Sequence, residues 1–189
     1  MARILAFAGS TRRDSLNKKL VSYAATRARE QGADVTLIDL REYPMPLYDG
    51  DLEDEQGAPD SATRVFQLMK QHDGLLLSCP EYNSSITGVL KNTIDWVSRP
   101  RDGEQPLAAF AGKVAGLMSA SPGGFGGMRG LVHVRAILSN IGVLVLPNQV
   151  AVARAHEAFG ADGLPREEST AKRVDTLVRE LIDTTQRLS

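Results

Sequence analysis

Short apolar runs alternate with longer amphipathic stretches along this chain. Five of the runs are short, almost free of charged residues and bounded by glycine or polar positions, which predicts buried strands. They are residues 3–8, 34–40, 74–79, 113–120 and a run that begins at 143–146. Between and after them, apolar residues recur at helical spacing, which predicts amphipathic helices. These stretches are residues 15–31, 61–71, 86–98, 126–141 and 173–188.

A regular alternation of strand and helix predicts an α/β fold with a parallel sheet and helices on both of its faces. Five strands suit a flavodoxin-like, doubly wound sheet of order 2-1-3-4-5. No internal repeat or low-complexity tract interrupts the pattern. The chain has 189 residues, which is the usual size of one domain, so we expect a single domain spanning 1–189.

Composition narrows the class of protein. The chain has 22 basic and 23 acidic residues and a net charge of -1, which argues against a nucleic-acid partner, because phosphate neutralisation needs clustered Lys and Arg. Apolar runs fall short of the ~18 residues that a membrane span needs, so no membrane is expected. The N-terminal apolar run is too short for a secretory signal. One cysteine cannot form an internal disulfide, and a reducing, cytoplasmic setting is expected.

Ligands of parallel α/β sheets bind beyond the carboxyl ends of the strands, so the segments that follow the strands are the candidate sites. The segment after the first strand is rich in hydroxyl groups and opens a helix, and a helix N-terminus suits a phosphate. Ser10, Ser15 and Asn17 could donate to phosphate oxygens, and Arg12 could add a charge-assisted bond. The alternative is helix capping by Asp14 or Ser15 with a solvated arginine.

Two familiar nucleotide signatures are missing. No G-x-G-x-x-G follows the first strand, so the usual dinucleotide fingerprint is not supported. No G-x-x-x-x-G-K-[ST] occurs either, because Gly112-Lys113 is followed by Val114. Nucleotide hydrolysis of the P-loop kind is therefore excluded.

Two more candidate segments follow the third and fourth strands. The first is a polar turn, Pro80-Glu81-Tyr82-Asn83-Ser84-Ser85, whose backbone N–H groups could face a ligand. Its alternative is a plain turn in which Ser85 caps the next helix. The second is a glycine-rich loop that contains Ser121, Gly123 and Gly124. Glycine lets a backbone approach a flat ligand closely, although such a loop can also be merely flexible.

Several motifs recur together in one known family. They are Gly9-Ser10-x-Arg12-x-x-Ser15-x-Asn17, Pro46-Leu47-Tyr48-Asp49-x-Asp51-Leu52-Glu53, Pro80-Glu81-Tyr82-Asn83-Ser84 with Gly88-Val89-Leu90-Lys91-Asn92-Thr93-Ile94-Asp95-Trp96, and Ser121-x-Gly123-Gly124. With these motifs the chain resembles the NADPH-dependent FMN reductase family, from Ile4 to about Val150. The resemblance implies a flavodoxin-like fold, FMN as cofactor, and NADPH or NADH as co-substrate.

The resemblance also implies roles for individual residues. Ser10, Arg12, Ser15 and Asn17 would bind the FMN phosphate. Pro80, Glu81, Tyr82, Asn83 and Ser84 would line the isoalloxazine ring, largely through backbone groups. Ser121, Gly123 and Gly124 would close the far side of the ring. Members of the family are usually homodimers or homotetramers, and the helix around Asp95-Trp96 would be a candidate interface.

The function expected from this resemblance is an FMN-dependent NAD(P)H oxidoreductase. Hydride would pass from NAD(P)H to FMN, and electrons would continue to a quinone, free flavin, metal oxyanion or similar small acceptor. The cofactor carries the chemistry, so neither a catalytic side chain nor a metal is required. The alternatives are a flavodoxin-like electron carrier, which the net charge of -1 disfavours, a flavin-binding sensor, and a nucleoside-processing enzyme with Glu81 as nucleophile.

The remaining chemically reactive residues have plainer interpretations. Cys79 is expected to be a buried strand residue, and Trp96 an anchor of its helix or of an interface. The acidic run 49–55 is expected to be a solvated loop at the rim of the site. Three arginines could hold a 2′-phosphate but are more commonly solvated: Arg13, Arg99 and Arg101. The three histidines lack metal-ligand spacing: His72, His133 and His156.

Overall fold

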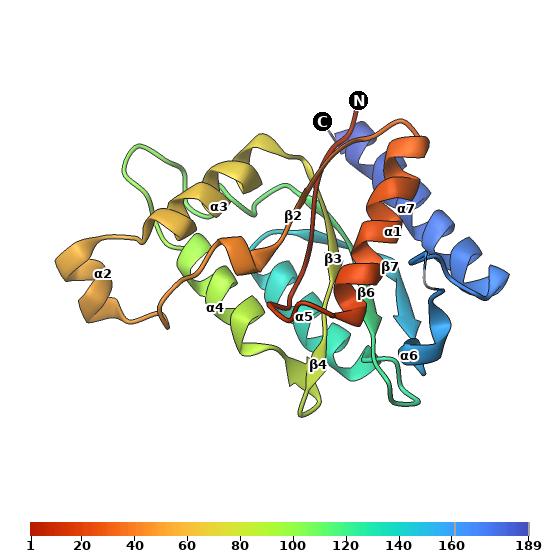
Figure 1. Ribbon diagram of the computed structural model, residues 1–189. Helices are drawn as coiled ribbons and strands as arrows, with labels where there is room; N and C mark the ends of the chain where they lie inside the picture. The colour runs from red at the N-terminus through yellow and green to blue at the C-terminus, as the bar shows by residue number, and fades with distance from the viewer. Residues whose placement is uncertain (161, 189) are drawn as a thin grey trace.

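Five parallel strands form the central sheet of the computed structural model, which describes residues 1–160 and 162–188. The strands are β1 (Arg3–Ala8), β2 (Asp34–Ile38), β3 (Gly74–Ser78), β6 (Val114–Ala120) and β7 (Leu144–Val152). Their order across the sheet is β2-β1-β3-β6-β7 (Figure 1). Counted along the chain this is 2-1-3-4-5, so the predicted flavodoxin-like topology is confirmed.

Helices cover both faces of the sheet (Figure 1). One face packs against α1 (Leu16–Glu30) and α7 (Glu168–Leu188), and the other against α3 (Asp60–Gln71), α4 (Gly88–Val97) and α5 (Met128–Asn140). Side chains of a strand alternate between the two faces. In β1, Ile4 and Ala6 therefore join the core under α1 and α7, while Leu5 and Phe7 join the core under the other three helices.

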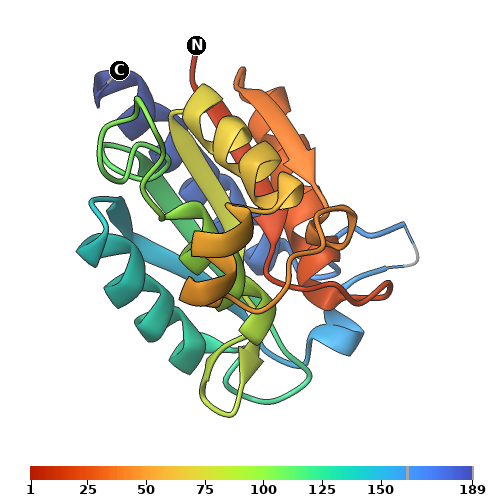
Figure 2. The same cartoon turned by 90° about the vertical axis from the view of Figure 1, so that its left-hand side faces the viewer.

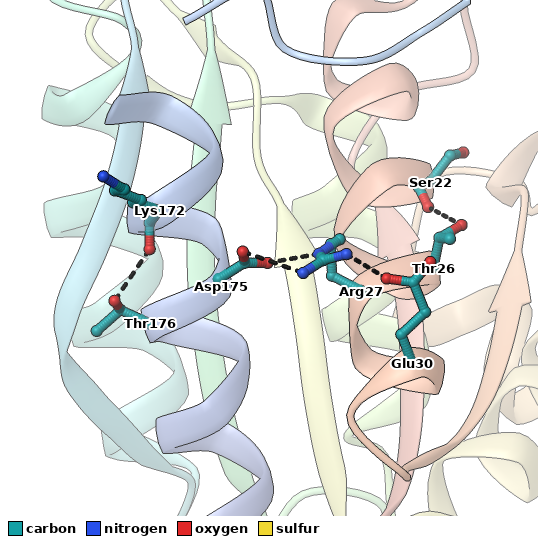
Figure 3. A network of polar contacts seen from close by, with 7 residues as sticks. All are labelled: Ser22, Thr26, Arg27, Glu30, Lys172, Asp175 and Thr176. Atoms are coloured by element: carbon teal, nitrogen blue, oxygen red, sulfur yellow. Dashed lines mark hydrogen bonds and ion pairs between the residues drawn. The ribbon is translucent and has the colours of Figure 1, made fainter. Parts of the chain in front are cut away.

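The first helix behaves as its sequence predicts. Ser15 is the N-cap of α1, because its hydroxyl accepts a hydrogen bond from the backbone N–H of Lys18. At the other end, Gly32 adopts a left-handed conformation with φ of 86°, which glycine reaches without steric cost. An ion pair joins this helix to the last one: the Arg27 guanidinium donates to both carboxylate oxygens of Asp175 at 2.6 and 3.2 Å (Figure 3).

The acidic run between the second strand and α3 is not the loop we expected. Its residues form the helix α2 (Gly50–Gln56), capped by the Asp49 side chain, and a 3-10 turn, η1 (Leu40–Glu42), precedes it. All seven residues of α2 are at least partly exposed, so no apolar stripe marked this helix in the sequence. It projects to one side of the sheet (Figure 1) and is held by Glu53, which pairs with Arg99 at 2.8 Å.

The predicted helix 86–98 begins two residues late, at Gly88. Ile86 belongs instead to a small antiparallel hairpin of β4 (Glu81–Tyr82) and β5 (Ser85–Ile86). The cap is Thr87 rather than Ser85, since the Thr87 hydroxyl accepts from the backbone N–H of Leu90. Two-residue strands are too short to show a period in the sequence, and Ile86 happens to fall in phase with the helical stripe.

The fifth strand continues past Pro147 to Val152, and its register against β6 shifts between Ala115 and Leu117. Proline has no N–H to donate, and β7 is an edge strand, where such an interruption is tolerated. The Arg135 side chain of α5 donates to the carbonyl groups of this stretch: Val145, Leu146 and Pro147. The irregular strand is thereby supplied with donors that its neighbour does not provide.

The helices near the C-terminus differ from the prediction in two ways. The last helix begins at Glu168, five residues before the expected start, because its charged first turn carries no apolar periodicity. A four-residue helix, α6 (Ala155–Ala158), follows β7 and was not predicted. Among the described residues, no helix is long and apolar enough to cross a membrane.

An ion pair at the amino edge of the sheet gives a pH-dependent prediction. The Arg3 guanidinium donates to Asp73 at 2.7 and 2.9 Å, and these bonds lower the pKa of the Asp73 carboxyl despite its partial burial. Because the pKa is lower in the folded state, the pair stabilises the protein above the ordinary Asp pKa and stops doing so as pH falls through the folded value. We expect Asp73→Asn to cost about 0.5–1 kcal/mol at pH 7 and progressively less as pH falls below the ordinary Asp pKa, measured by urea unfolding. A cost that stays constant with pH would contradict this.

Candidate functional site

Three segments that follow strands meet at the carboxyl edge of the sheet. We call them the first loop (residues 9–15), the hairpin segment (79–87) and the glycine loop (121–127). Each continues the hydrogen bonding of the sheet: Gly9 N donates to Ser78 O at 2.9 Å, Cys79 N to Met118 O at 2.7 Å, and Ser121 N to Val152 O at 3.1 Å. Figures 1 and 2 show the hairpin and the glycine loop at the same end of the molecule, opposite both termini.

The buried Asn17 side chain connects α1 to the ends of two strands at this edge. Its amide oxygen accepts from the Ser78 hydroxyl at 2.9 Å and from the backbone N–H of Ala120 at 3.0 Å. Its amide nitrogen donates to the carbonyl of Ala120 at 2.8 Å. These three bonds use both acceptor positions and one of the two amide hydrogens. Asn17 is only 4% exposed, so it links α1 to the ends of β3 and β6, a role that the sequence did not indicate.

The first loop has the chemistry of an anion site. The Ser10 hydroxyl accepts from the backbone N–H of Arg12 at 3.3 Å, and Ser10 and Ser15 are almost fully buried. Arg12 is exposed on the loop. The first turn of α1 contains no acidic residue, so the one carboxylate close to the positive N-terminus of the helix along the chain is that of exposed Asp14, directly before the N-cap. This arrangement favours a bound phosphate.

The hairpin turns sharply at Asn83 and Ser84. Both residues have left-handed backbone conformations, with φ of 51° and 65°. A two-residue turn with positive φ at both positions matches the twist of the flanking strands, and Asn tolerates it better than most residues. Pro80 is buried, whereas Tyr82 is 54% exposed. The turn therefore presents backbone groups and one aromatic ring at the edge of the sheet.

The Glu81 side chain takes part in a cluster that the sequence did not predict. Its carboxylate accepts hydrogen bonds from the backbone N–H groups of Arg129 and Gly130 and from the Arg129 guanidinium. A carboxylate so fully engaged is a poor nucleophile. The nucleoside-processing alternative therefore lacks the free carboxylate that it needs.

The glycine loop is held in place at its first residues. The Ser121 hydroxyl accepts from Gly123 N at 3.2 Å, and the carbonyl of Gly123 accepts from Arg154 N at 3.2 Å. Space is open around Gly124, where an added Cβ would meet nothing within 4 Å. At Gly126 an added Cβ would lie 2.8 Å from the backbone atoms of Val152, the last residue of β7, and of Ala153. Gly126 also has a left-handed backbone conformation, with φ of 59°. The loop thus combines a tightly packed base with an open outer stretch.

Sequence reasoning missed two residues that organise the edge. The Thr87 hydroxyl donates to Gly9 O at 2.7 Å, which ties the hairpin segment to the first loop. Arg129 binds Glu81 and lies over the Phe125 ring at 5.2 Å. A threonine just before a helix signals a cap, but its second bond to a distant loop has no sequence signal. The same holds for the Arg129 pair, whose partner is 48 residues away.

A groove of about 690 Å³ lies beside α1 and the segment that precedes α7. Arg13, Asp14 and Ser15 border one part of it, Leu164 and Pro165 another, and the ion-paired helices α1 and α7 of Figure 3 lie next to it. Its walls are the outer surface of α1 and the 162–165 segment, so it lies to the side of the hairpin and glycine loop. Size alone does not make it the reaction site, because the convergent polar groups lie at the sheet edge.

The remaining candidates of the sequence take structural positions. Cys79 is buried as predicted, although β3 ends one residue before it at Ser78, and burial raises the pKa of its thiol to about 12. Trp96 is fully buried and donates to Pro46 O at 2.8 Å, so it anchors the segment before α2 rather than a ligand. Arg99 is paired with Glu53, and Arg101 lies over the Phe66 ring at 5.3 Å. In the described part of the chain, no three His, Cys, Asp or Glu side chains group to hold a metal.

Comparison with known proteins agrees with this geometry. The family model for NADPH-dependent FMN reductases matches residues 2–157. An NAD(P)H-dependent FMN reductase of Pseudomonas aeruginosa is 36% identical over 181 residues, which are 95% of this chain and 89% of that protein. A quinone reductase of Escherichia coli is 35% identical over 147 residues, which are 76% of this chain and 73% of that protein.

A solved structure resembles the whole molecule. The flavoenzyme NAD(P)H:(acceptor) oxidoreductase FerB of Paracoccus denitrificans superposes with a TM-score of 0.84 at 28% identity, covering 99% of this chain and 98% of that one. The fold, the three loops at the carboxyl edge and the sequence matches all lead to one assignment. The chain belongs to the NADPH-dependent FMN reductase family.

Proposed function

We propose that this protein is an FMN-dependent NAD(P)H oxidoreductase that reduces a small-molecule acceptor such as a quinone, free flavin or a metal oxyanion. When bound, FMN supplies the redox chemistry, since it can take a hydride from NAD(P)H and release electrons to an acceptor. The observation that carries the proposal is the convergence of the first loop, the hairpin and the glycine loop at one sheet edge. The family assignment and its relatives, named as FMN and quinone reductases, support the same activity.

The FMN phosphate would bind at the first loop. Ser10 and Ser15 place hydroxyl groups at the N-terminus of α1, and Arg12 would swing its exposed guanidinium onto the phosphate. Asn17 would contribute through its one remaining amide hydrogen, and chiefly by holding the loop against the sheet. The fit is supported by the chemistry of these donors and by the absence of acidic side chains from the first turn of the helix.

The isoalloxazine ring would lie between the hairpin and the glycine loop. One side of the ring would be lined mainly by backbone groups of the hairpin, from Pro80, Glu81, Tyr82, Asn83 and Ser84. The Glu81 side chain would not contribute, because its carboxylate is hydrogen-bonded to Arg129 and Gly130. The other side would be formed by Ser121, Gly123 and Gly124, and the open space around Gly124 leaves room for a flat ligand. Backbone N–H groups aimed at the ring would stabilise negative charge that develops on reduction.

We extend the proposal to the assembly and setting of the protein. The chain would form a single domain, 1–189, and would act in the cytoplasm, which the lone buried cysteine favours. It would assemble as a homodimer or homotetramer, and exposed apolar side chains beside the hairpin are suited to such a contact: Tyr82, Phe125, Met128 and Val132. Trp96 itself is buried, so a contact around Asp95 would involve its neighbours on α4.

The proposal is tested by the visible spectrum of the purified protein supplied with FMN and titrated anaerobically with NADPH or NADH. We expect flavin bands that become perturbed on binding and bleach within seconds after the reductant is added. A bound flavin that stays oxidised with both reductants would favour an electron carrier or a sensor. Failure to bind FMN would reject the proposed site.

A further inference from the structure

The Glu81 carboxylate and the N-terminus of α5 form an unusually complete contact. One carboxylate oxygen accepts from the backbone N–H groups of Arg129 and Gly130 at 3.0 and 3.1 Å. The other accepts from the Arg129 guanidinium, with Nε at 2.8 Å and a second, closer bond from Nη2. The Glu81 side chain is only 7% exposed. Four donors therefore satisfy a carboxylate that is almost entirely removed from solvent.

This contact joins two segments that are far apart in the sequence. Glu81 begins the hairpin that would support one side of the ring, and Arg129 is the second residue of α5, which follows the glycine loop that would close the other side. At Gly130 an added Cβ would lie 3.1 Å from Ser85 O and 3.3 Å from Glu81 Cβ. At Gly127 an added Cβ would clash with the Ser119 hydroxyl. The glycines let the two backbones approach closely enough for the carboxylate to reach both N–H groups.

The contact also decides the charge beside the proposed ring site. Burial alone would raise the pKa of Glu81, but the hydrogen bonds from Arg129 and Gly130 outweigh burial and keep the pKa below its ordinary value. Glu81 is therefore ionised at neutral pH, and Arg129 offsets its charge. The Arg129 guanidinium also lies over Phe125 in the glycine loop, 5.2 Å from the ring centroid, so one side chain contacts both segments.

We propose that the Glu81–Arg129 pair is a positioning element that holds the hairpin and the glycine loop at the separation a flat flavin needs and keeps the charge beside the flavin balanced. The identity of the ligand rests on the proposed function. The link between the hairpin and the glycine loop rests on the Glu81–Arg129 hydrogen bonds described above. Glu81 acts here through Arg129 and the helix N-terminus, not on the reacting atoms. This assignment concerns the Glu81 side chain, whereas the backbone of the hairpin remains the group that would face the ring.

Removing the charge of Glu81 and removing the charge of Arg129 should shift the midpoint potential of bound FMN in opposite directions. Glu81→Gln leaves the arginine cation unbalanced, which favours the more negative, reduced FMN and raises the midpoint potential. Arg129→Gln leaves the carboxylate unbalanced and lowers the potential. We expect each variant to change the ratio of affinities for reduced and oxidised FMN about tenfold, equivalent to about 30 mV for a two-electron couple. Both substitutions should weaken the binding of oxidised FMN, because each loosens the contact that holds the hairpin and the glycine loop together. Potential shifts of one sign in both variants, or none, would overturn the charge role.

Hydrogen–deuterium exchange of the FMN-free protein tests the linkage without the cofactor. Residues 81–86 and 121–130 should exchange faster in both variants than in the wild type. Unchanged exchange would overturn the positioning role, whether or not FMN binds. Matched controls are Glu168→Gln and Lys172→Gln, which remove the same charges from an exposed ion pair on α7 and should leave both readouts unchanged. If the wild type bound no FMN, the proposed function would fail while the exchange experiment still decided the linkage.

Discussion

The Asn17→Ala variant is expected to lose about 2–4 kcal/mol of unfolding free energy. The amide of Asn17 satisfies the Ser78 hydroxyl and both backbone groups of Ala120, at 2.8 to 3.0 Å. Alanine would leave these groups without a partner in a buried place, and each such group costs roughly 1–3 kcal/mol, less whatever water or rotation recovers. Three interactions are lost at once, which places this change among the larger effects of a single substitution.

Urea unfolding followed by circular dichroism measures this loss, and thermal unfolding should show a decrease of roughly 5–12 °C in Tm. The matched control is Asn148→Ala. The Asn148 amide also forms hydrogen bonds, to both oxygens of Glu180, but in an exposed position, so its removal should cost less than about 0.5 kcal/mol. Equal effects of the two substitutions would show that Asn17 does not hold the ends of β3 and β6 as its contacts indicate.

The Arg12→Ala variant is expected to bind FMN about 10- to 100-fold more weakly than the wild type. A hydrogen bond from a guanidinium to a phosphate contributes about 1.5–3 kcal/mol, and 1.4 kcal/mol corresponds to a factor of ten in affinity. Because Arg12 is exposed, its removal should leave stability within about 0.5 kcal/mol of the wild type. Titration of FMN fluorescence against protein concentration gives the Kd.

Arg13→Ala is the control for this experiment. Arg13 is the next residue, carries the same charge and is also exposed, but it lines the groove beside α1. Its loss should change FMN affinity by no more than about threefold, the screened effect of one nearby surface charge. If both variants lost affinity equally, Arg12 would act only through the general positive potential of the loop. If neither did, the phosphate would have to bind elsewhere.

The sequence indicates the parts of the candidate site to different degrees. The first loop was accessible because its signal is local: a strand, a cluster of hydroxyl groups and the start of a helix lie within nine residues. Ser15 as N-cap follows from the same stretch. The sequence predicts only a polar turn at residues 80–85, whereas the structure forms a hairpin over 81–86, because the left-handed pair Asn83 and Ser84 is set by the pairing of β4 with β5.

By itself the sequence determined the layers of this protein. Buried strands such as β1, and the amphipathic stripe of α7, are encoded in the period of apolar residues, because one face or both must be removed from water. This fixes the parallel α/β class, and the number of strands made the 2-1-3-4-5 order the expected one. Helices without a buried apolar stripe could not be predicted in this way. One example is α2, whose residues are all fully or partly exposed.

Only the tertiary structure decided which polar groups satisfy one another. Asn17 meets Ala120 across 103 residues, Thr87 meets Gly9 across 78, and Glu81 meets Arg129 across 48. A hydrogen bond depends on position to within a few tenths of an ångström, and a periodic pattern specifies only which face a residue occupies. The apolar pattern therefore brings the three loops to one edge of the sheet, and the packed backbone then selects the partners that give this edge its shape and charge.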